Sequence, residues 1–284
     1  MSLVVKSCCK VNLLLNVLCR REDGFHEIES IMQPVPIHDE LHIERAESGV
    51  ELTCNNPRLS VGTDNLVHRA ASAFLKLTKS GGVRIHLQKN LPLAAGIGAG
   101  SSNAAMTLRG LNQLYNQPLS AGNILELAAK LGSDVPFFLQ DDPALVTGRG
   151  EFVRSLKPFS ALIGSGMLLV HPGFGVNTPW AYQALAKNPE PFEVEGHAER
   201  MINSLGEGRL EGFNNSLEAA VFPKFSVLPL IKEFLFANGA RASLMSGSGS
   251  TMFAITEDRP LAEALRAMYH ERFGQAGWSA TVAL

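Results

Sequence analysis

The chain has 284 residues, of which 45% are hydrophobic and 18% are charged, a composition typical of a globular protein and not of a disordered one. Its formal net charge of −2 gives no general attraction to nucleic acid or to anionic lipid. No stretch approaches the roughly 18 apolar residues that span a bilayer. We therefore expect a cytoplasmic protein with no nucleic-acid or membrane partner, present as a monomer or a weak homodimer.

Apolar residues alternate along three segments of the N-terminal part, which predicts strands around residues 11–17, 41–43 and 83–87. Residues 64–82, between the second and third strands, have the spacing of a helix. Asp64 is expected to cap the N-terminus of this helix, because an aspartate side chain can accept a hydrogen bond from a free amide of the first turn.

Helical spacing returns after a glycine-rich run. It predicts helices over residues 102–115 and 120–132, and a short helix that starts at residues 133–136. A hairpin around residues 148–150 follows, then an apolar strand at 166–172 and a final helix capped by Asp258. Strands and helices are mixed without a strict βαβ alternation, so α+β is the predicted fold class.

The glycine-rich run, residues 92–102, places Gly96, Gly98 and Gly100 between a predicted strand and a predicted helix. Such a run can turn its backbone amides inward as an anion nest, and the following helix adds its own free amides. No lysine follows as in a Walker A loop, and the third glycine comes one residue early for a dinucleotide fingerprint. The run predicts a phosphate site, and a tight turn without a ligand stays open.

Read with its neighbours, this run resembles the ATP loop of the GHMP kinase superfamily, P-x-x-x-G-[LI]-G-[GA]-G-S-S. Residues 10–17 (KVNLLLNV) resemble the first motif of that superfamily, and residues 244–255 (LMSGSGSTMFAI) resemble the third. Within it, D-G-F-H at 23–26 and G-S-D-V-P-F at 132–137 are similar to the family that phosphorylates 4-diphosphocytidyl-2-C-methyl-D-erythritol.

The resemblance implies a two-domain fold with the active site in the cleft between the domains. The N-terminal domain, 1–155, would be ribosomal-protein-S5-domain-2-like, and the C-terminal domain, 156–284, an α/β GHMP domain. The implied reaction moves the γ-phosphoryl group of ATP, accompanied by Mg²⁺, to the 2-hydroxyl of the substrate in non-mevalonate isoprenoid biosynthesis. A homoserine or mevalonate type of kinase, or a non-catalytic nucleotide-binding protein, is the alternative.

In the family pattern, Asp134 accepts the hydroxyl proton and Lys10 is paired with it across the reacting hydroxyl. The residues alone also allow two other interpretations. Asp134 can be a simple helix cap, and Lys10 can be a lysine on the solvent face of an edge strand. His38 to His42 (HDELH) nearly spells a zinc motif, but the acid that follows the first histidine is Asp39, and the segment reads as a strand. We therefore expect no metal there.

The resemblance assigns the remaining site residues in two groups. The ATP group is expected to comprise Pro92, Leu93, Ala94, Ala95, Gly96, Ile97, Gly98, Ala99, Gly100, Ser101, Ser102, Asn65 and Lys89, with Ser101 or Ser102 also able to reach Mg²⁺. The substrate group is expected to comprise Asn12, Phe25, His26, Thr178, Tyr182, Gly247 and Ser248. Phe25 stands where the family more often has tyrosine, and Ala94–Ala95 where glycine is frequent.

Overall fold

Two long strands carry the N-terminal part of the computed structural model, which describes residues 2–187 and 192–284. They are β1 (Ser2–Arg20) and β2 (His26–Ala46). The chain divides into two compact units that interleave along the sequence: residues 1–9, 36–93 and 98–141 form unit 1, and residues 10–35, 94–97 and 142–284 form unit 2. Both strands therefore contribute residues to both units, and the predicted boundary at residue 155 stays a prediction.

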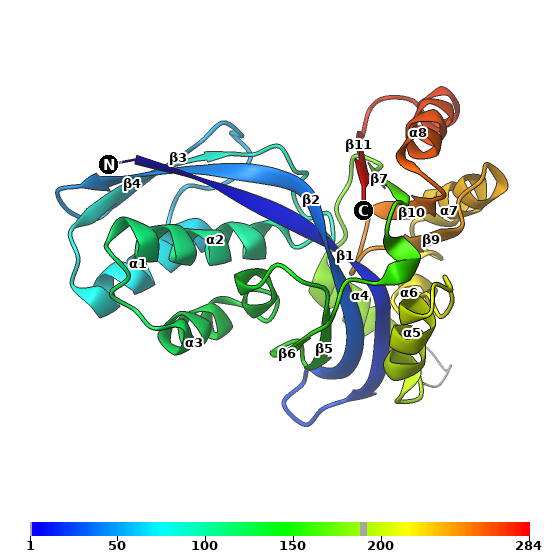
Figure 1. Ribbon diagram of the computed structural model, residues 1–284, viewed down its shortest axis with the longest axis horizontal. Helices are drawn as coiled ribbons and strands as arrows, with labels where there is room; N and C mark the ends of the chain where they lie inside the picture. The colour runs from blue at the N-terminus through cyan, green and yellow to red at the C-terminus, as the bar shows by residue number, and fades with distance from the viewer. Residues whose placement is uncertain (1, 188–191) are drawn as a thin grey trace. The chain divides into compact units, whose positions relative to one another are not determined.

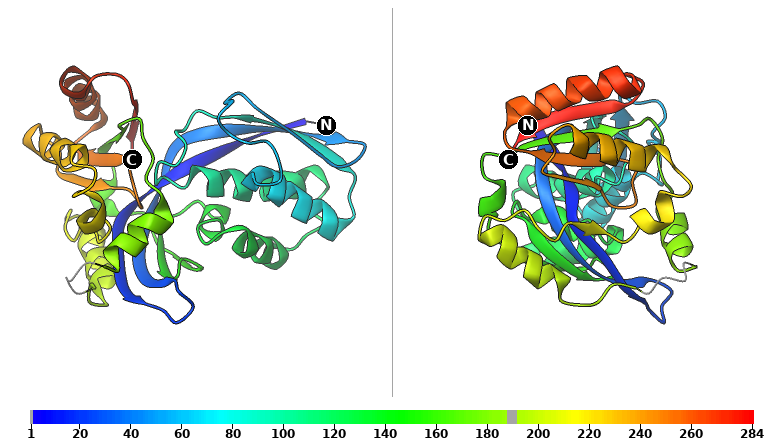
Figure 2. Two further views of the ribbon diagram at one scale, coloured as in Figure 1. Left: turned by 180° about the vertical axis from the view of Figure 1, so that it is seen from behind. Right: turned by 90° about the vertical axis from the view of Figure 1, so that its right-hand side faces the viewer.

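Unit 1 is a sheet covered by helices. Strand β4 pairs antiparallel with β2 and parallel with β3, and α1 and α2 pack on each other beside these strands (Figure 1). Figure 2 shows the same arrangement from behind. The elements that lie wholly in unit 1 are β3 (Val50–Cys54), α1 (Leu66–Thr78), β4 (Gly82–Gln88), α2 (Ala99–Leu114), α3 (Ala121–Leu131) and the 3₁₀ helix η1 (Pro136–Leu139).

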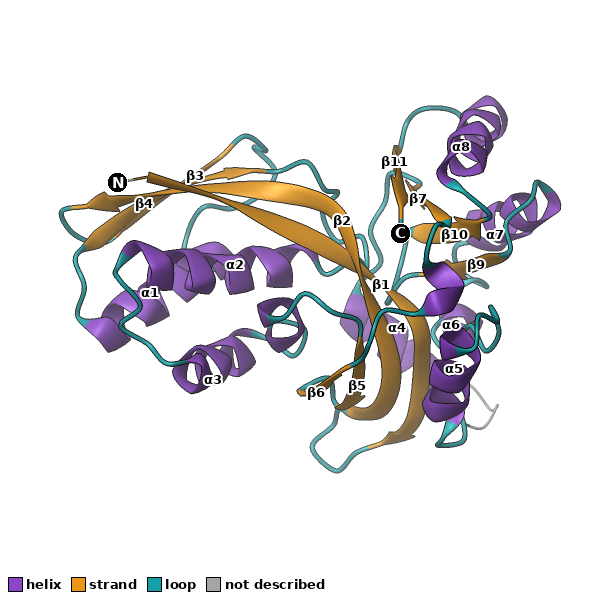
Figure 3. Cartoon of the chain, in the orientation of Figure 1, coloured by secondary structure: helices purple, strands orange, loops and turns teal. Residues whose placement is uncertain are grey.

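Unit 2 contains a four-stranded sheet in the order β11-β7-β10-β9, on which α7 and α8 pack (Figure 3). Its other strands are β8, which pairs parallel with β1, and the hairpin β5–β6, which extends β2. The elements of unit 2 are β5 (Ala144–Gly148), β6 (Phe152–Ser155), the 3₁₀ helix η2 (Ser160–Leu162), β7 (Gly166–His171), α4 (Thr178–Leu185), α5 (His197–Gly206), β8 (Asn214–Asn215), α6 (Glu218–Val221), α7 (Val227–Ala237), β9 (Ala242–Met245), β10 (Met252–Thr256), α8 (Arg259–Phe273) and β11 (Trp278–Ala283).

The buried faces follow the alternation and the helical spacing that the sequence shows. In unit 1, Phe74 of α1 and Leu108 of α2 are fully buried, as is Ile85 of β4. In unit 2, residues of β7, β10, α7 and α8 form one apolar cluster. The α+β class and the predicted helices and strands are confirmed, and no helix among the described residues is both long and apolar enough to cross a membrane.

The predicted N-cap of the first helix is wrong. The N-cap of α1 is Asn65, whose side chain accepts a hydrogen bond from the Val67 amide, while Asp64 accepts one from the Ser60 hydroxyl. A cap must precede the first helical residue, and α1 begins at Leu66, one residue later than the Asp64 cap requires. At α4 the N-cap is Asn177, and Thr178 is the first residue of the helix.

Candidate active site

The glycine-rich run forms a loop between β4 and α2 whose backbone is left-handed at three positions. The φ angles are +52° at Ala94, +77° at Gly96 and +68° at Gly98. Gly98 is the N-cap of α2, and no side chain caps this helix. The first-turn amides of α2 therefore have no capping side chain, which leaves the positive end of a 16-residue helix suited to an anion.

Gly96 is required by its surroundings as well as by its φ angle. A Cβ atom at this position would lie 2.1 Å from the Ser246 carbonyl oxygen and 2.9 Å from the Gly249 amide nitrogen. The backbone amide of Thr251 donates to the Ala95 carbonyl at 3.2 Å. The small residues of the third motif thus allow two backbone segments to lie in direct contact within unit 2.

The ammonium group of Lys10 lies beside this contact. Lys10 is 3% exposed, and its Nζ donates to Asn12 Oδ1 at 2.6 Å and to the Gly96 carbonyl at 3.2 Å. Asn12 in turn donates from Nδ2 to Ser30 Oγ at 2.8 Å, so the amide is fixed on both sides. The reading of Lys10 as a solvent-facing lysine is wrong, because a buried ammonium group must be held by acceptors such as these.

The same Gly96 carbonyl accepts a second hydrogen bond, from Ser246 Oγ at 3.0 Å. Ser246 is fully buried. Lys10, Gly96 and Ser246 come from the first, second and third motifs, and one backbone oxygen joins them. Ser246, the first serine of the small-residue run, was not among the predicted site residues.

His26 lies in an aromatic cluster of unit 2 and carries an unpartnered buried nitrogen. Its ring centroid is 5.2 Å from that of Tyr182 and 6.1 Å from that of Phe192. Burial, reinforced by the charge of Arg20, lowers the pKa of His26, so the neutral imidazole is favoured. Among the described residues, His26 Nε2 is one of few buried polar side-chain atoms without a hydrogen-bond partner, and such an atom suits a polar ligand.

Phe25 precedes His26 at the end of a tight turn. Gly24 has a φ angle of +84°, and Asp23 Oδ1 accepts a hydrogen bond from the Phe25 amide at 3.1 Å. The Phe25 ring is 50% exposed, and the guanidinium carbon of Arg149 lies 5.0 Å from its centroid. An exposed aromatic ring held in this way offers a surface on which a flat ring can stack.

Thr178, Gly247 and Ser248 lie together in unit 2. Thr178 Oγ1 and Ser248 Oγ are hydrogen-bonded at 2.8 Å. Asn215, which is 3% exposed, donates from Nδ2 to the carbonyls of Met245 and Gly247 at 2.7 and 2.8 Å. These bonds give the third motif a fixed backbone path and place two hydroxyl groups side by side.

Asp134, Ser101 and Ser102 belong to unit 1. Asp134 is half-buried and lies in the turn before η1, where Pro136 occupies the first turn. Ser102 is 1% exposed, and its Oγ accepts a hydrogen bond from Ser7 Oγ at 2.8 Å, so this hydroxyl is directed to the interior of the unit. Ser101 is half-buried. The pairing of Lys10 with Asp134 stays a prediction.

The side chains of Asn65 and Lys89 both form polar contacts within unit 1. Asn65 caps α1 and donates from Nδ2 to the Ser60 carbonyl at 2.5 Å. The Lys89 side chain is 2% exposed, and its Nζ lies 2.5 Å from Asp39 Oδ2. Asp39 was considered only as part of the HDELH segment, although Asp39, Leu41 and Ile43 alternate along β2 and therefore share its buried face.

Two family models match the chain. GHMP kinases N terminal domain matches residues 65–142, and GHMP kinases C terminal matches residues 195–275. The first range contains the glycine-rich loop and Asp134, and the second contains Ser246 and its neighbours. Among the described residues no group of three or more His, Cys, Asp or Glu side chains is arranged to hold a metal ion.

Curated relatives and solved structures are similar over nearly the whole chain. A 4-diphosphocytidyl-2-C-methyl-D-erythritol kinase of Pelobacter propionicus is 39% identical over 99% of this chain and 98% of its own length, and one of Citrifermentans bemidjiense is 41% identical over 89% of each. The crystal structure of a 4-(cytidine 5'-diphospho)-2C-methyl-D-erythritol kinase, 36% identical, covers 99% of this chain and 100% of its own with a TM-score of 0.82. A homoserine kinase from Cytophaga hutchinsonii, 20% identical with a TM-score of 0.71, shares the fold over 99% of this chain and 93% of its own. The chain therefore belongs to the GHMP kinases and, within them, to the 4-diphosphocytidyl-2-C-methyl-D-erythritol kinase family.

Proposed function

We propose that this chain transfers the γ-phosphoryl group of ATP to the 2-hydroxyl group of 4-diphosphocytidyl-2-C-methyl-D-erythritol. The hydroxyl oxygen bonds to the γ-phosphorus while the bond from that phosphorus to the bridging oxygen of ADP breaks. The products are the 2-phosphate and ADP, and the reaction serves non-mevalonate isoprenoid precursor synthesis. The relatives that carry this name match the chain over nearly its full length, which supports the assignment.

Phosphoryl transfer depends on positioning and on neutralisation of charge more than on covalent chemistry by the protein. The first-turn amides of α2 and the left-handed backbone of the glycine loop suit the phosphates of ATP. We assign to the Asp134 carboxylate the role of general base, which accepts the proton of the acceptor's 2-hydroxyl group. Lys10, oriented by Asn12 and by the Gly96 carbonyl, then stabilises negative charge on the acceptor oxygen and the transferring group.

One observation carries the choice of acceptor: the buried, unpartnered Nε2 of His26 within an aromatic cluster. A cytosine ring offers hydrogen-bonding groups at its edge and a flat apolar face, and this cluster complements both. Phe25 and Tyr182 supply stacking surfaces, and His26 supplies the polar contact. Thr178 and Ser248 supply hydroxyl groups for the remainder of the substrate.

Magnesium, when bound with ATP, neutralises charge on the phosphate oxygens. The donor set of the chain fits an ion held largely by the nucleotide, because the described residues contain no cluster of three metal-binding side chains. Of the two candidate hydroxyls, we favour Ser101, because Ser102 Oγ already accepts a hydrogen bond from Ser7.

The cytoplasmic location and the monomeric or weakly dimeric state stay predictions. A kinase that consumes ATP works where ATP is supplied, so we place the protein in the cytoplasm. Cell fractionation and sedimentation of the purified protein test the two statements separately.

The assignment is tested by incubating the protein with ATP, Mg²⁺ and 4-diphosphocytidyl-2-C-methyl-D-erythritol and measuring ADP. We expect ADP release that depends on the acceptor, and a fall in kcat of about 10²–10⁴-fold in Asp134→Ala, the usual size of a general-base contribution. Turnover of homoserine or mevalonate without turnover of this acceptor would move the chain to another GHMP kinase activity. Unchanged turnover in Asp134→Ala would remove Asp134 as the base.

A further inference from the structure

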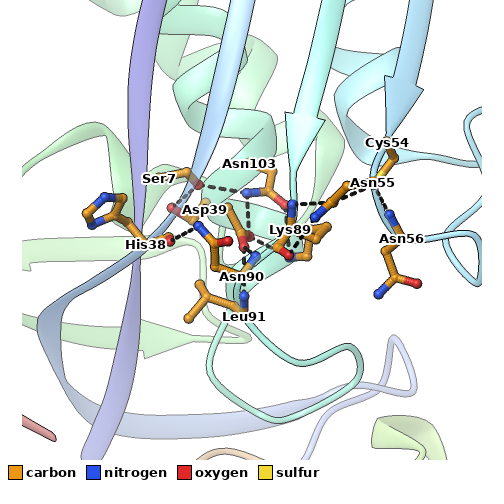
Figure 4. A network of polar contacts seen from close by, with 11 residues as sticks. Ser7, His38, Asp39, Cys54, Asn55, Asn56, Lys89, Asn90, Leu91 and Asn103 are labelled. Carbon is orange, nitrogen blue, oxygen red and sulfur yellow. Dashed lines mark hydrogen bonds and ion pairs between the residues drawn. The ribbon is translucent and has the colours of Figure 1, made fainter. Parts of the chain in front are cut away.

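A fully buried carboxylate, Asp39, is the centre of a polar network in unit 1 that the proposed reaction does not use directly (Figure 4). Its Oδ1 accepts hydrogen bonds from the backbone amides of Asn90 at 2.8 Å and Leu91 at 2.9 Å. Its Oδ2 accepts from Lys89 Nζ at 2.5 Å and from Asn103 Nδ2 at 2.9 Å. Four donors thus satisfy one carboxylate that has no exposure to solvent.

The groups that Asp39 holds lie at the two ends of the glycine-rich loop. Asn90 and Leu91 come immediately before Pro92, where the loop begins, and Asn103 lies in α2 just beyond the loop serines. These three residues belong to the same compact unit as Asp39. One carboxylate therefore connects the segment that enters the loop to the helix that leaves it.

The far end of the loop has a second attachment through Ser7 of β1. Asn103 Nδ2 donates to Ser7 Oγ at 2.9 Å, and Ser7 Oγ donates to Ser102 Oγ at 2.8 Å. Lys89 Nζ also donates to Asn103 Oδ1 at 3.3 Å. The first turns of α2 are consequently fixed to β1 and β2 by bonds that solvent cannot replace, because Ser7, Ser102 and Asn103 are at most 2% exposed.

We propose that Asp39, Lys89 and Asn103 form a positioning network that sets the distance between the two ends of the ATP loop. The inference rests on the proposed function for the identity of the ligand. The first-turn amides of α2 bind phosphate well only if they are held in place before the ligand arrives. A buried ion pair contributes little net stability, and the role proposed for this one is to specify a single arrangement of its partners. Lys89 acts in this network and does not contact a phosphate, since its ammonium group is directed at Asp39.

The test compares two buried asparagines of α2. Asn103→Leu removes the bond to Asp39 Oδ2 and leaves that carboxylate three donors, so no unpaired charge is created. Asn112→Leu is the matched control: Asn112 is also buried and also bridges to another segment, through the amide and the carbonyl of Leu119. Asn112 lies about 13 Å farther along α2 than Asn103.

We expect Asn103→Leu to raise the Kd for ADP, measured by calorimetry, and the KM for ATP about tenfold, as the loss of one charge-assisted hydrogen bond implies. The KM for the acceptor stays unchanged, and Asn112→Leu changes neither nucleotide constant. Equal nucleotide constants in the two variants would overturn the proposal. If Asn103→Leu fails to fold, Ser7→Ala decides, with an expected rise of a few fold in the Kd for ADP and none if the network is only structural.

The ADP measurement separates this inference from the proposed function. Weaker ADP binding in Asn103→Leu supports the network even if the wild-type protein fails to phosphorylate the cytidine-linked acceptor. Conversely, an active wild-type enzyme whose Asn103→Leu variant binds ADP normally retains the proposed function and refutes the network.

Discussion

Substitution of Gly96 by alanine perturbs the contact between the second and third motifs with a predictable magnitude. A Cβ atom in the left-handed region costs about 1–2 kcal/mol. The new atom would also lie 2.1 Å from the Ser246 carbonyl oxygen, so two backbone segments must separate by roughly 1 Å, and overpacking of this kind costs about 1–3 kcal/mol. We expect the free energy of unfolding to fall by about 2–5 kcal/mol in total.

Gly96→Ala should also lose activity beyond what its lower stability explains, because the Gly96 carbonyl accepts a hydrogen bond from Lys10 Nζ. A displacement of this size at a catalytic group costs about 100-fold in kcat/KM. Urea unfolding measures the free energy of unfolding, and ADP release at saturating ATP measures the activity. Gly206→Ala is the control, since a Cβ atom at Gly206, the last residue of α5, would meet nothing within 4 Å. A Gly96→Ala variant as stable and as active as this control would refute the reasoning.

Two further substitutions test other parts of unit 2. His26→Phe should keep the ring contact with Tyr182 but raise the KM for the acceptor about tenfold through loss of Nε2, while an equal rise in the KM for ATP would contradict a role in the acceptor site. Because the folded-state pKa of His26 is lowered, the unfolded chain binds the proton more readily, so stability should fall as pH drops below about 6.5, and His26→Phe should make that fall shallower in urea titrations at successive pH values. Lys232→Met should lower the free energy of unfolding by about 3 kcal/mol, because Glu218, whose pKa is already raised by burial, loses its ion-pair partner. Glu218→Gln combined with Lys232→Met should recover most of that loss in urea unfolding, and a double variant as unstable as Lys232→Met would contradict the ion-pair explanation.

Local patterns were sufficient to predict the elements that depend on neighbouring residues. In the helix over 99–114 the apolar residues Leu108 and Leu111 are fully buried, Asp258 caps α8 as expected, and β5 and β6 form the predicted hairpin around residues 148–150. The cap of α1 was displaced by one residue because Asp64 and Asn65 can both cap a helix, and only the φ and ψ angles distinguish them.

The roles that sequence reasoning missed depend on contacts between residues far apart in the chain. Ser246 bonds to a carbonyl 150 residues away, and Asp39 bonds to Asn103, 64 residues away. Because Asp39 is an acidic residue on the apolar face of a strand, a buried partner is expected for it, but periodicity cannot identify that partner. The predicted place of Lys89 near the nucleotide stays a prediction, and its ammonium group is paired with Asp39 inside unit 1.

The Gly96 carbonyl has a consequence for how this chain can be divided or recombined. Lys10 and Ser246 meet at that oxygen, although one lies near the start of the sequence and the other near its end. A fragment that ends at residue 155 keeps Lys10 and Gly96 but loses the serine that also fixes their position. If the C-terminal halves of two relatives were exchanged, the position of Lys10 would depend on a serine loop that comes from the other protein. The two halves therefore have to be chosen together.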